Sequence, residues 1–195
     1  MNKHLAIMKD AIGSYAKAQK TAEEKRVKVN DTYLPDVAAR ELAIIQVDLA
    51  AKRKEALQQI ENAYSNAKTE VEDWGKLDGN KINDADLKLL QLDLSPEEFS
   101  EVCARNRSNG TMCSILMKHA NEHNAALREK HKGELFPFGI YDTEAIPSVQ
   151  SKAAKWDAIY KGATNMINSL GSADPYTRSA VEKAVPTWGD NVVLE

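Results

Sequence analysis

The feature that most constrains this chain is a long stretch, residues 36–74, that contains no glycine or proline. Apolar side chains recur along it at steps of three and four residues, which places them on one side of an α-helix. Apart from Arg53, the stripe consists of Ala38, Leu42, Ile45, Leu49, Ala56, Ile60, Tyr64, Ala67, Val71 and Trp74. The steps average 3.6 residues, so the pattern predicts a nearly straight helix, on the order of 55 Å long at ~1.5 Å per residue.

A second amphipathic segment precedes this helix. Its stripe consists of Leu5, Met8, Ile12, Tyr15, Gln19, Ala22, Arg26 and Val29. Pro35 then suits the first turn of the following helix, because it has no amide to donate. Residues 1–75 are therefore predicted to form a helical hairpin. Its first helix is the shorter one, so we expect the uncovered part of the second stripe to make the hairpin an oligomerisation arm. A compact bundle that buries both stripes is the alternative.

The rest of the chain is predicted to be helical in shorter pieces. The Ser-Pro-Glu-Glu run at residues 95–98 forms a capping box with proline at the first helical position, so a helix begins there. We expect residues 76–132 to form a short-helix bundle. Residues 133–195 are expected to supply C-terminal helices and an apolar tail that pack with 76–132. The predicted fold class is all-α, a long N-terminal antiparallel helical hairpin followed by a smaller helical bundle.

Charge and composition argue against several kinds of partner. The formal net charge is −3 and the basic residues do not cluster, so general nucleic-acid binding is not expected. No apolar run approaches the roughly 20 residues that a membrane span requires, and the residues after Met1 do not resemble a signal peptide. Cys103 and Cys113 are expected to be buried thiols in a reducing compartment. We therefore expect the chain in the cytoplasm, or in a particle assembled there.

One segment, His119-Ala120-Asn121-Glu122-His123, matches the H-x-x-E-H pattern of a class of zinc peptidases. Histidines four residues apart on a helix can both reach one zinc ion, and the glutamate can polarise a bound water. The pattern fixes only three residue types, and no third ligand lies in a recognisable motif. We therefore predict no metal, with His119, Glu122 and His123 as weak candidates and metal-dependent hydrolysis as a remote alternative.

Two arginines, Arg105 and Arg107, lie just before the helix predicted to begin near Thr111. The amide end of a helix attracts anions, so these arginines are a candidate contact for a phosphate or for a partner's carboxylate. A solvated turn between helices is the other interpretation. The sequence contains no glycine-rich phosphate loop and no G-x-S-x-G elbow, so we expect neither an enzyme nor a cofactor.

The order of the parts resembles that of a known group of proteins. After the hairpin come Trp74-Gly75-Lys76-Leu77-Asp78-Gly79, Leu89-Leu90, Leu94-Ser95-Pro96-Glu97-Glu98-Phe99 and Asn109-Gly110-Thr111-Met112. This arrangement, over residues 33–125, resembles uncharacterised helical proteins from virion-assembly gene clusters of tailed phages of Gram-positive bacteria. The resemblance implies no catalytic residues in this chain. It implies a capsid-associated role such as scaffolding, in the cytoplasm of the infected bacterial cell or in the assembling particle.

These observations predict a non-enzymatic phage assembly or structural protein, scaffold-like or capsid-associated, that acts through protein–protein contacts. We expect a homo-oligomer, with a capsid or other virion protein as a further partner. The residues predicted to make such contacts are Leu42, Ile45, Leu49, Ile60, Tyr64 and Trp188. The alternative is an intracellular phage inhibitor or adaptor that binds a host protein.

Overall fold

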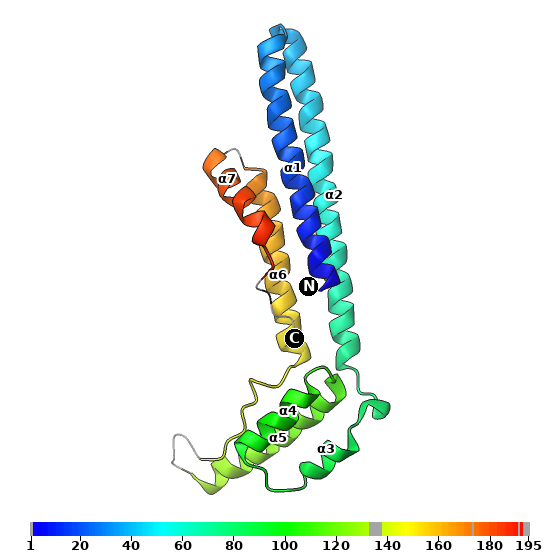
Figure 1. The fold of residues 1–195 in the computed structure, drawn as a ribbon, viewed down its shortest axis with the longest axis vertical. Helices are drawn as coiled ribbons and strands as arrows, with labels where there is room; N and C mark the ends of the chain where they lie inside the picture. The colour runs from blue at the N-terminus through cyan, green and yellow to red at the C-terminus, as the bar shows by residue number, and fades with distance from the viewer. Residues whose placement is uncertain (1, 133–137, 173, 191, 193–195) are drawn as a thin grey trace. The chain divides into compact units, whose positions relative to one another are not determined.

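The computed structural model describes residues 2–132, 138–172, 174–190 and 192, and the regular elements among them are all helical (Figure 1). They are α1 (Lys3–Thr32), α2 (Pro35–Gly75), η1 (Gly79–Lys81), α3 (Asp84–Leu89), α4 (Pro96–Asn106), α5 (Gly110–Lys130), α6 (Val149–Leu170), α7 (Pro175–Ala184) and η2 (Val185–Thr187). This confirms the predicted all-α class. None of the described helices is apolar over a stretch long enough to cross a membrane.

The chain divides into two compact units, and each is described by itself. Unit 1 combines residues 1–68 with residues 155–194, and unit 2 comprises residues 69–154. The boundary therefore falls inside α2 and inside α6.

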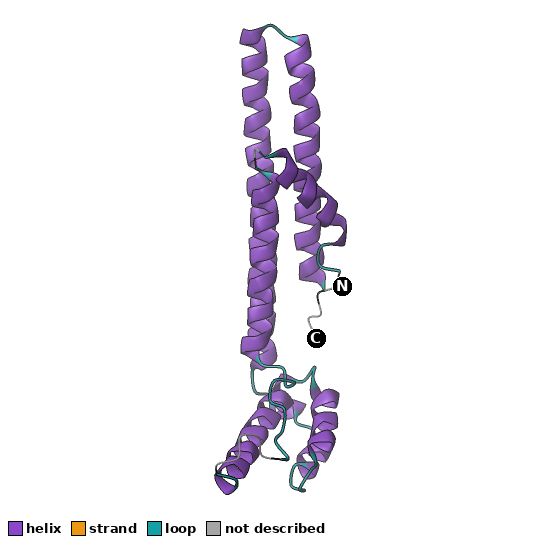
Figure 2. Ribbon diagram, turned by 90° about the vertical axis from the view of Figure 1, so that its left-hand side faces the viewer, coloured by secondary structure: helices purple, strands orange, loops and turns teal. Residues whose placement is uncertain are grey.

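The predicted hairpin is present in unit 1, where α1 and α2 lie side by side and are joined by a short turn (Figures 1 and 2). The turn forms at Tyr33, whose extended backbone ends α1, and Pro35 then begins α2. Nearest the turn, Ala22 and Val29 of α1 pack with Ala38 and Ile45 of α2 in one buried cluster. The two stripes seen in the sequence therefore face each other here.

Farther from the turn, α6 packs on α2. Ile60 is fully buried there. The ring of Tyr64 stacks on the ring of Tyr160 of α6, with 4.4 Å between their centroids. The Tyr64 hydroxyl donates to Asp157, and the Tyr160 hydroxyl donates to Glu61, each at 2.5 Å. Part of the α2 stripe is therefore covered by α6 of the same chain.

The C-terminal segment does not pack as the sequence predicted. The described residues from 155 onward belong to the hairpin's unit and not to the unit of the short helices. The Arg53 guanidinium donates to the side chain of Asn168 at 2.8 Å, and Lys9 forms an ion pair with Asp190 at 2.6 Å. The physical reason is that the apolar stripe of α6 needs a long apolar partner, and the hairpin offers one.

In unit 2, α4 packs against α5, and a buried carboxylate ties these helices to α3. Asp86 is 4 % exposed. Its carboxylate accepts hydrogen bonds from Asn106 at 2.6 Å, from Asn83 at 2.8 Å and from Arg105 at 2.9 Å. Three donors satisfy a charge that burial would otherwise make costly. The predicted capping box of α4 is confirmed, with both of its hydrogen bonds present.

The start of α5 supports a first prediction, about Gly110. A Cβ at this position would lie 1.9 Å from the carbonyl oxygen of Trp74, a backbone atom that cannot rotate away. Gly110→Ala should therefore lower the free energy of unfolding by about 1–3 kcal/mol, as overpacking typically does. Urea titration followed by circular dichroism measures this loss.

Gly79→Ala is the matched control, because nothing lies within 4 Å of a Cβ added there. Its effect should stay within about 0.5 kcal/mol, as is usual for open surface positions. Equal stabilities for the two variants would contradict the close contact between Gly110 and Trp74.

Candidate functional site

The part of the hairpin nearest its turn exposes apolar side chains. We call residues 27–47 the outer hairpin. Helix α7 contacts α1 at Glu23, whose carboxylate lies 3.6 Å from the guanidinium of Arg178. In Figure 1, α1 and α2 continue past the ends of α6 and α7. The exposed apolar side chains of the outer hairpin are Val27, Tyr33, Leu34, Val37, Ile44 and Val47, with exposed fractions from 43 % to 78 %.

These residues are not the ones that the sequence pattern predicted. Leu42, Ile45 and Leu49 point toward α1 and help to form the buried cluster between the two helices. Ile60 is fully buried in unit 1, which corrects its prediction as a partner-binding residue. The first stripe on α2 is therefore used inside the chain, because α1 and α6 cover it.

The two aromatic residues predicted to make contacts are also engaged within unit 1. Tyr64 lies in its stack with Tyr160. Trp188 is half-buried, and its indole nitrogen lies 3.8 Å from the position that a Cβ on Gly162 of α6 would take. The described part of the tail therefore folds back on α6.

The sequence did contain a signal for the exposed residues. Val37, Ile44 and Ala51 are spaced by seven residues, and Val47 lies three residues after Ile44. Such spacing marks a second apolar line on the same helix. It was missed because the first stripe is longer and accounts for more of the apolar residues.

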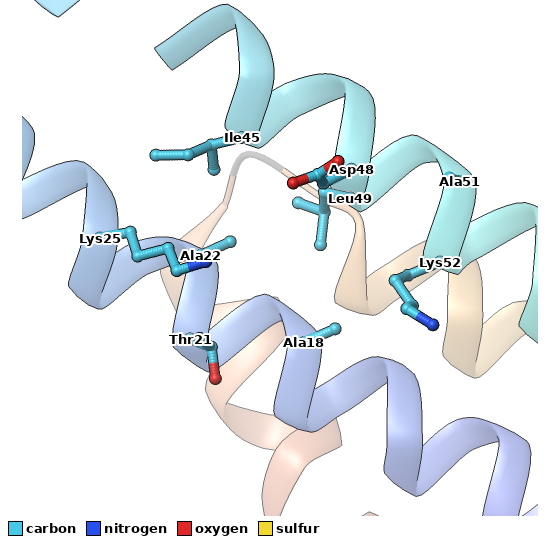
Figure 3. Close-up of a pocket in the computed structure, with 9 residues that line it drawn as sticks. All are labelled: Ala18, Thr21, Ala22, Lys25, Ile45, Asp48, Leu49, Ala51 and Lys52. Carbon is cyan, nitrogen blue, oxygen red and sulfur yellow. The ribbon is translucent and has the colours of Figure 1, made fainter. Parts of the chain in front are cut away.

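Beside the apolar line of Val37, Ile44 and Ala51, a groove with a volume of about 370 Å³ lies between α1 and α2 (Figure 3). The residues that line it are Ala18, Thr21, Ala22, Lys25, Ile45, Asp48, Leu49, Ala51 and Lys52. Ile45 and Leu49 extend from α2 toward α1, and the small side chains of Ala18 and Ala22 leave the space open (Figure 3). The groove is therefore apolar at its floor and carries charges at its rim.

The two histidines of the zinc-peptidase pattern belong to an aromatic stack. The ring of Tyr141 lies between those of Phe99 and His123, with centroid separations of 4.0 Å and 3.9 Å. His119 stacks on Phe99 at 5.9 Å. Nε2 of His123 lies 3.1 Å from the carbonyl oxygen of Gly139, which can only accept a hydrogen bond. This ring nitrogen is therefore a donor and is not directed at a shared ion.

The surroundings of the stack do not complete a metal site either. Glu122 lies 3.9 Å from Lys118, with its carboxylate largely exposed. Across the described ranges, no three His, Cys, Asp or Glu side chains come together in a group that could hold a metal ion. Both histidine rings instead pack within the aromatic stack.

The candidate anion contact is not assembled as predicted. Arg105 is turned toward the buried carboxylate of Asp86. At the start of α5, the Asn109 side chain accepts from the Met112 amide at 3.2 Å, and Gly110 lies against the carbonyl of Trp74. Arg107 is exposed at the end of α4. The amide end of α5 thus has partners from within unit 2, and Arg105 is engaged with Asp86.

The two cysteines lie in the buried cluster of unit 2. Burial, helped by the neighbouring Cys113, raises the pKa of the Cys103 thiol to about 11. Burial also raises the pKa of Cys113. Thiols held in the neutral form are poor nucleophiles, so both residues act here as small apolar side chains.

Comparisons of this chain with protein-family models, with curated proteins and with solved structures found no match.

The aromatic stack predicts a pH dependence. Burial lowers the pKa of His119 below its model-compound value of 6.5, and His123 lowers it further, although Glu122 raises it. At a pH below 6.5, His119 binds a proton more readily in the unfolded chain than in the folded chain. The free energy of unfolding therefore falls as the pH falls. We expect the urea midpoint of the wild type to decline from about pH 7 to pH 5. The decline should be smaller in His119→Gln, and identical slopes would contradict this role.

A further prediction concerns zinc. Because the histidine rings are used for stacking, neither zinc chloride nor a chelator should shift the thermal unfolding midpoint of the wild-type protein. Differential scanning fluorimetry with one to five molar equivalents of zinc measures this. A rise in the midpoint that disappears in both His119→Gln and His123→Gln would instead establish a zinc site.

Proposed function

We propose that this protein is a non-enzymatic assembly or structural component that acts through protein–protein contacts made by its hairpin. The observation that carries the proposal is the set of exposed apolar side chains on the outer hairpin, which includes Leu34 at 78 % and Val47 at 69 % exposure. Burying a side chain of this size contributes roughly 1.5–3 kcal/mol, so a partner that covered several of them would be held firmly.

The distribution of the apolar residues supports this proposal. Val37, Ile44 and Val47 lie along one helix, within reach of a single partner surface. Isolated exposed apolar residues are ordinary on protein surfaces, whereas neighbouring ones are typical of interaction sites. The outer hairpin has only two helices across its width, so a third or fourth helix from a partner would complete a bundle of the usual kind.

The biological setting that we propose is the assembly of a tailed-phage particle, with the chain acting as a scaffold-like or capsid-associated protein in the infected cell. This part of the proposal comes from the sequence resemblance over residues 33–125. Mass spectrometry of procapsids and virions from the phage that encodes the chain tests it directly. Absence of the chain from both particles, together with capture of a host protein, would favour the inhibitor or adaptor role instead.

The contact surface is tested by replacing two exposed apolar residues with charged ones. Leu34→Glu/Val47→Glu should reduce self-association, or binding to an isolated capsid protein, by at least ten-fold, because each change removes apolar contact area and adds a charge. Sedimentation velocity at micromolar to hundred-micromolar concentrations measures the effect. Both positions are exposed, so the helix content should be unchanged.

Leu77→Glu/Leu92→Glu is the matched control, because these leucines are also exposed, at 75 % and 60 %, but lie in unit 2. It should associate as the wild type does. A wild type that stays monomeric and binds no virion or host protein would overturn the proposal, and so would equal losses in the two double variants.

A further inference from the structure

Helix α7 contributes little buried surface to unit 1. Of its described side chains, residues 176–184, none is buried, and Tyr176 is 87 % exposed. Asp174 caps the helix by accepting hydrogen bonds from the amides of Tyr176 and Thr177 and from the Thr177 hydroxyl, so these bonds are local to α7. A helix of ten residues is marginal in water by itself. Contacts with the rest of unit 1 must therefore keep α7 folded.

The chain is well packed immediately before and after α7. Leu170, the last residue of α6, is fully buried. After α7, Val185 is buried, and its side chain lies 3.9 Å from the position that a Cβ on Gly13 of α1 would take. A little farther on, Gly189 lies against the side chain of Leu5. The exposed helix therefore lies between two packed points of the chain.

Between these points, an ion pair joins α7 to the hairpin. The guanidinium of Arg178 lies 3.6 Å from the carboxylate of Glu23 on α1, and the two side chains are 21 % and 52 % exposed. Arg26 lies at the same distance from the same carboxylate oxygen, so the two guanidiniums compete for it. In the described part of the chain, no other ion pair connects residues 176–184 to the hairpin.

The ion pair lies at the edge of a second groove, which we call the polar groove, with a volume of about 750 Å³. It runs between α1 and α2, and Gly171, Ser172 and Arg178 form one of its walls. Its hairpin side includes Leu42 and Leu49 from the apolar stripe of α2. Movement of α7 away from α1 takes Arg178 out of the wall, so it widens the polar groove.

We propose that α7 is a strap that opens and closes while its two ends stay packed, and that the ion pair between Arg178 and Glu23 is its latch. In the closed state, which the structure shows, the latch holds α7 against α1. When the latch breaks, the short helix loses its charged contact with the hairpin and unfolds, and the polar groove opens. The strap works in the same way whichever partner the outer hairpin binds.

Hydrogen–deuterium exchange of the full-length chain, measured by mass spectrometry, reports how often α7 opens. In Glu23→Gln the amides of residues 178–184 should exchange roughly two- to five-fold faster than in the wild type, as expected for the loss of one partly exposed ion pair. The amides of α1 and α2 should be unaffected. Raising sodium chloride from about 0.02 M to about 0.5 M should accelerate α7 exchange in the wild type, because salt screens the pair, but not in Glu23→Gln.

Arg26→Gln is the matched control, because it removes the other guanidinium from the same carboxylate oxygen. Without this competitor Arg178 has Glu23 to itself, so α7 should exchange no faster than in the wild type. Glu23→Arg should open α7 more than Glu23→Gln does, because it brings three guanidiniums together. Adding Arg178→Glu to Glu23→Arg reverses the ion pair and should restore slow exchange.

Two results would overturn the strap. One is unchanged exchange of α7 in Glu23→Gln, and the other is an acceleration that spreads equally over α1 and α2, because it would report a loss of stability of the whole unit. Faster exchange of α7 without any response to salt would overturn the ion pair as the latch. None of these results bears on association through the outer hairpin, which is measured separately.

Discussion

The packing of α6 on the hairpin is the contact on which the rest of unit 1 depends. The apolar stripe on α2 is longer than α1 can cover. Since α6 packs along α2, with Tyr160 stacked on Tyr64, the long helix is stabilised within one chain. Because α6 and α7 both lie on one flank, the opposite flank remains accessible, as do the exposed apolar residues near the turn. The same contact that completes the fold therefore decides which surface is available to a partner.

Unit 2 uses its chemically active residues for its own structure. The carboxylate of Asp86 is surrounded by three donors, one of them Arg105. The rings of His119 and His123 pack with Phe99 and Tyr141. Burial of a polar group lowers the stability of the fold unless the group is hydrogen-bonded. Buried polar groups in a small helical unit therefore usually form hydrogen bonds within that unit. This explains why residues that suggest a ligand in the sequence have partners within the unit.

Local features were predicted well because their causes lie within a few residues. The capping box at Ser95 and the break before Pro35 both appear where the sequence places them. The candidate site was predicted less well. The hairpin is present as predicted, but the residues named on it were those that face inward, because a stripe of apolar residues marks a buried face without saying which element buries it.

The sequence by itself determined that the chain is all-α and that its first part is a hairpin of two long helices, since spacing and caps act over single turns of helix. Only the tertiary structure decided that α6 belongs with the hairpin, and that Ile60 is internal while Val47 is exposed. The physical reason is that the hydrophobic effect is non-directional, so an apolar stripe does not specify which surface will cover it. Several elements carry matching stripes, and the choice among them depends on the length and shape of the surfaces that meet.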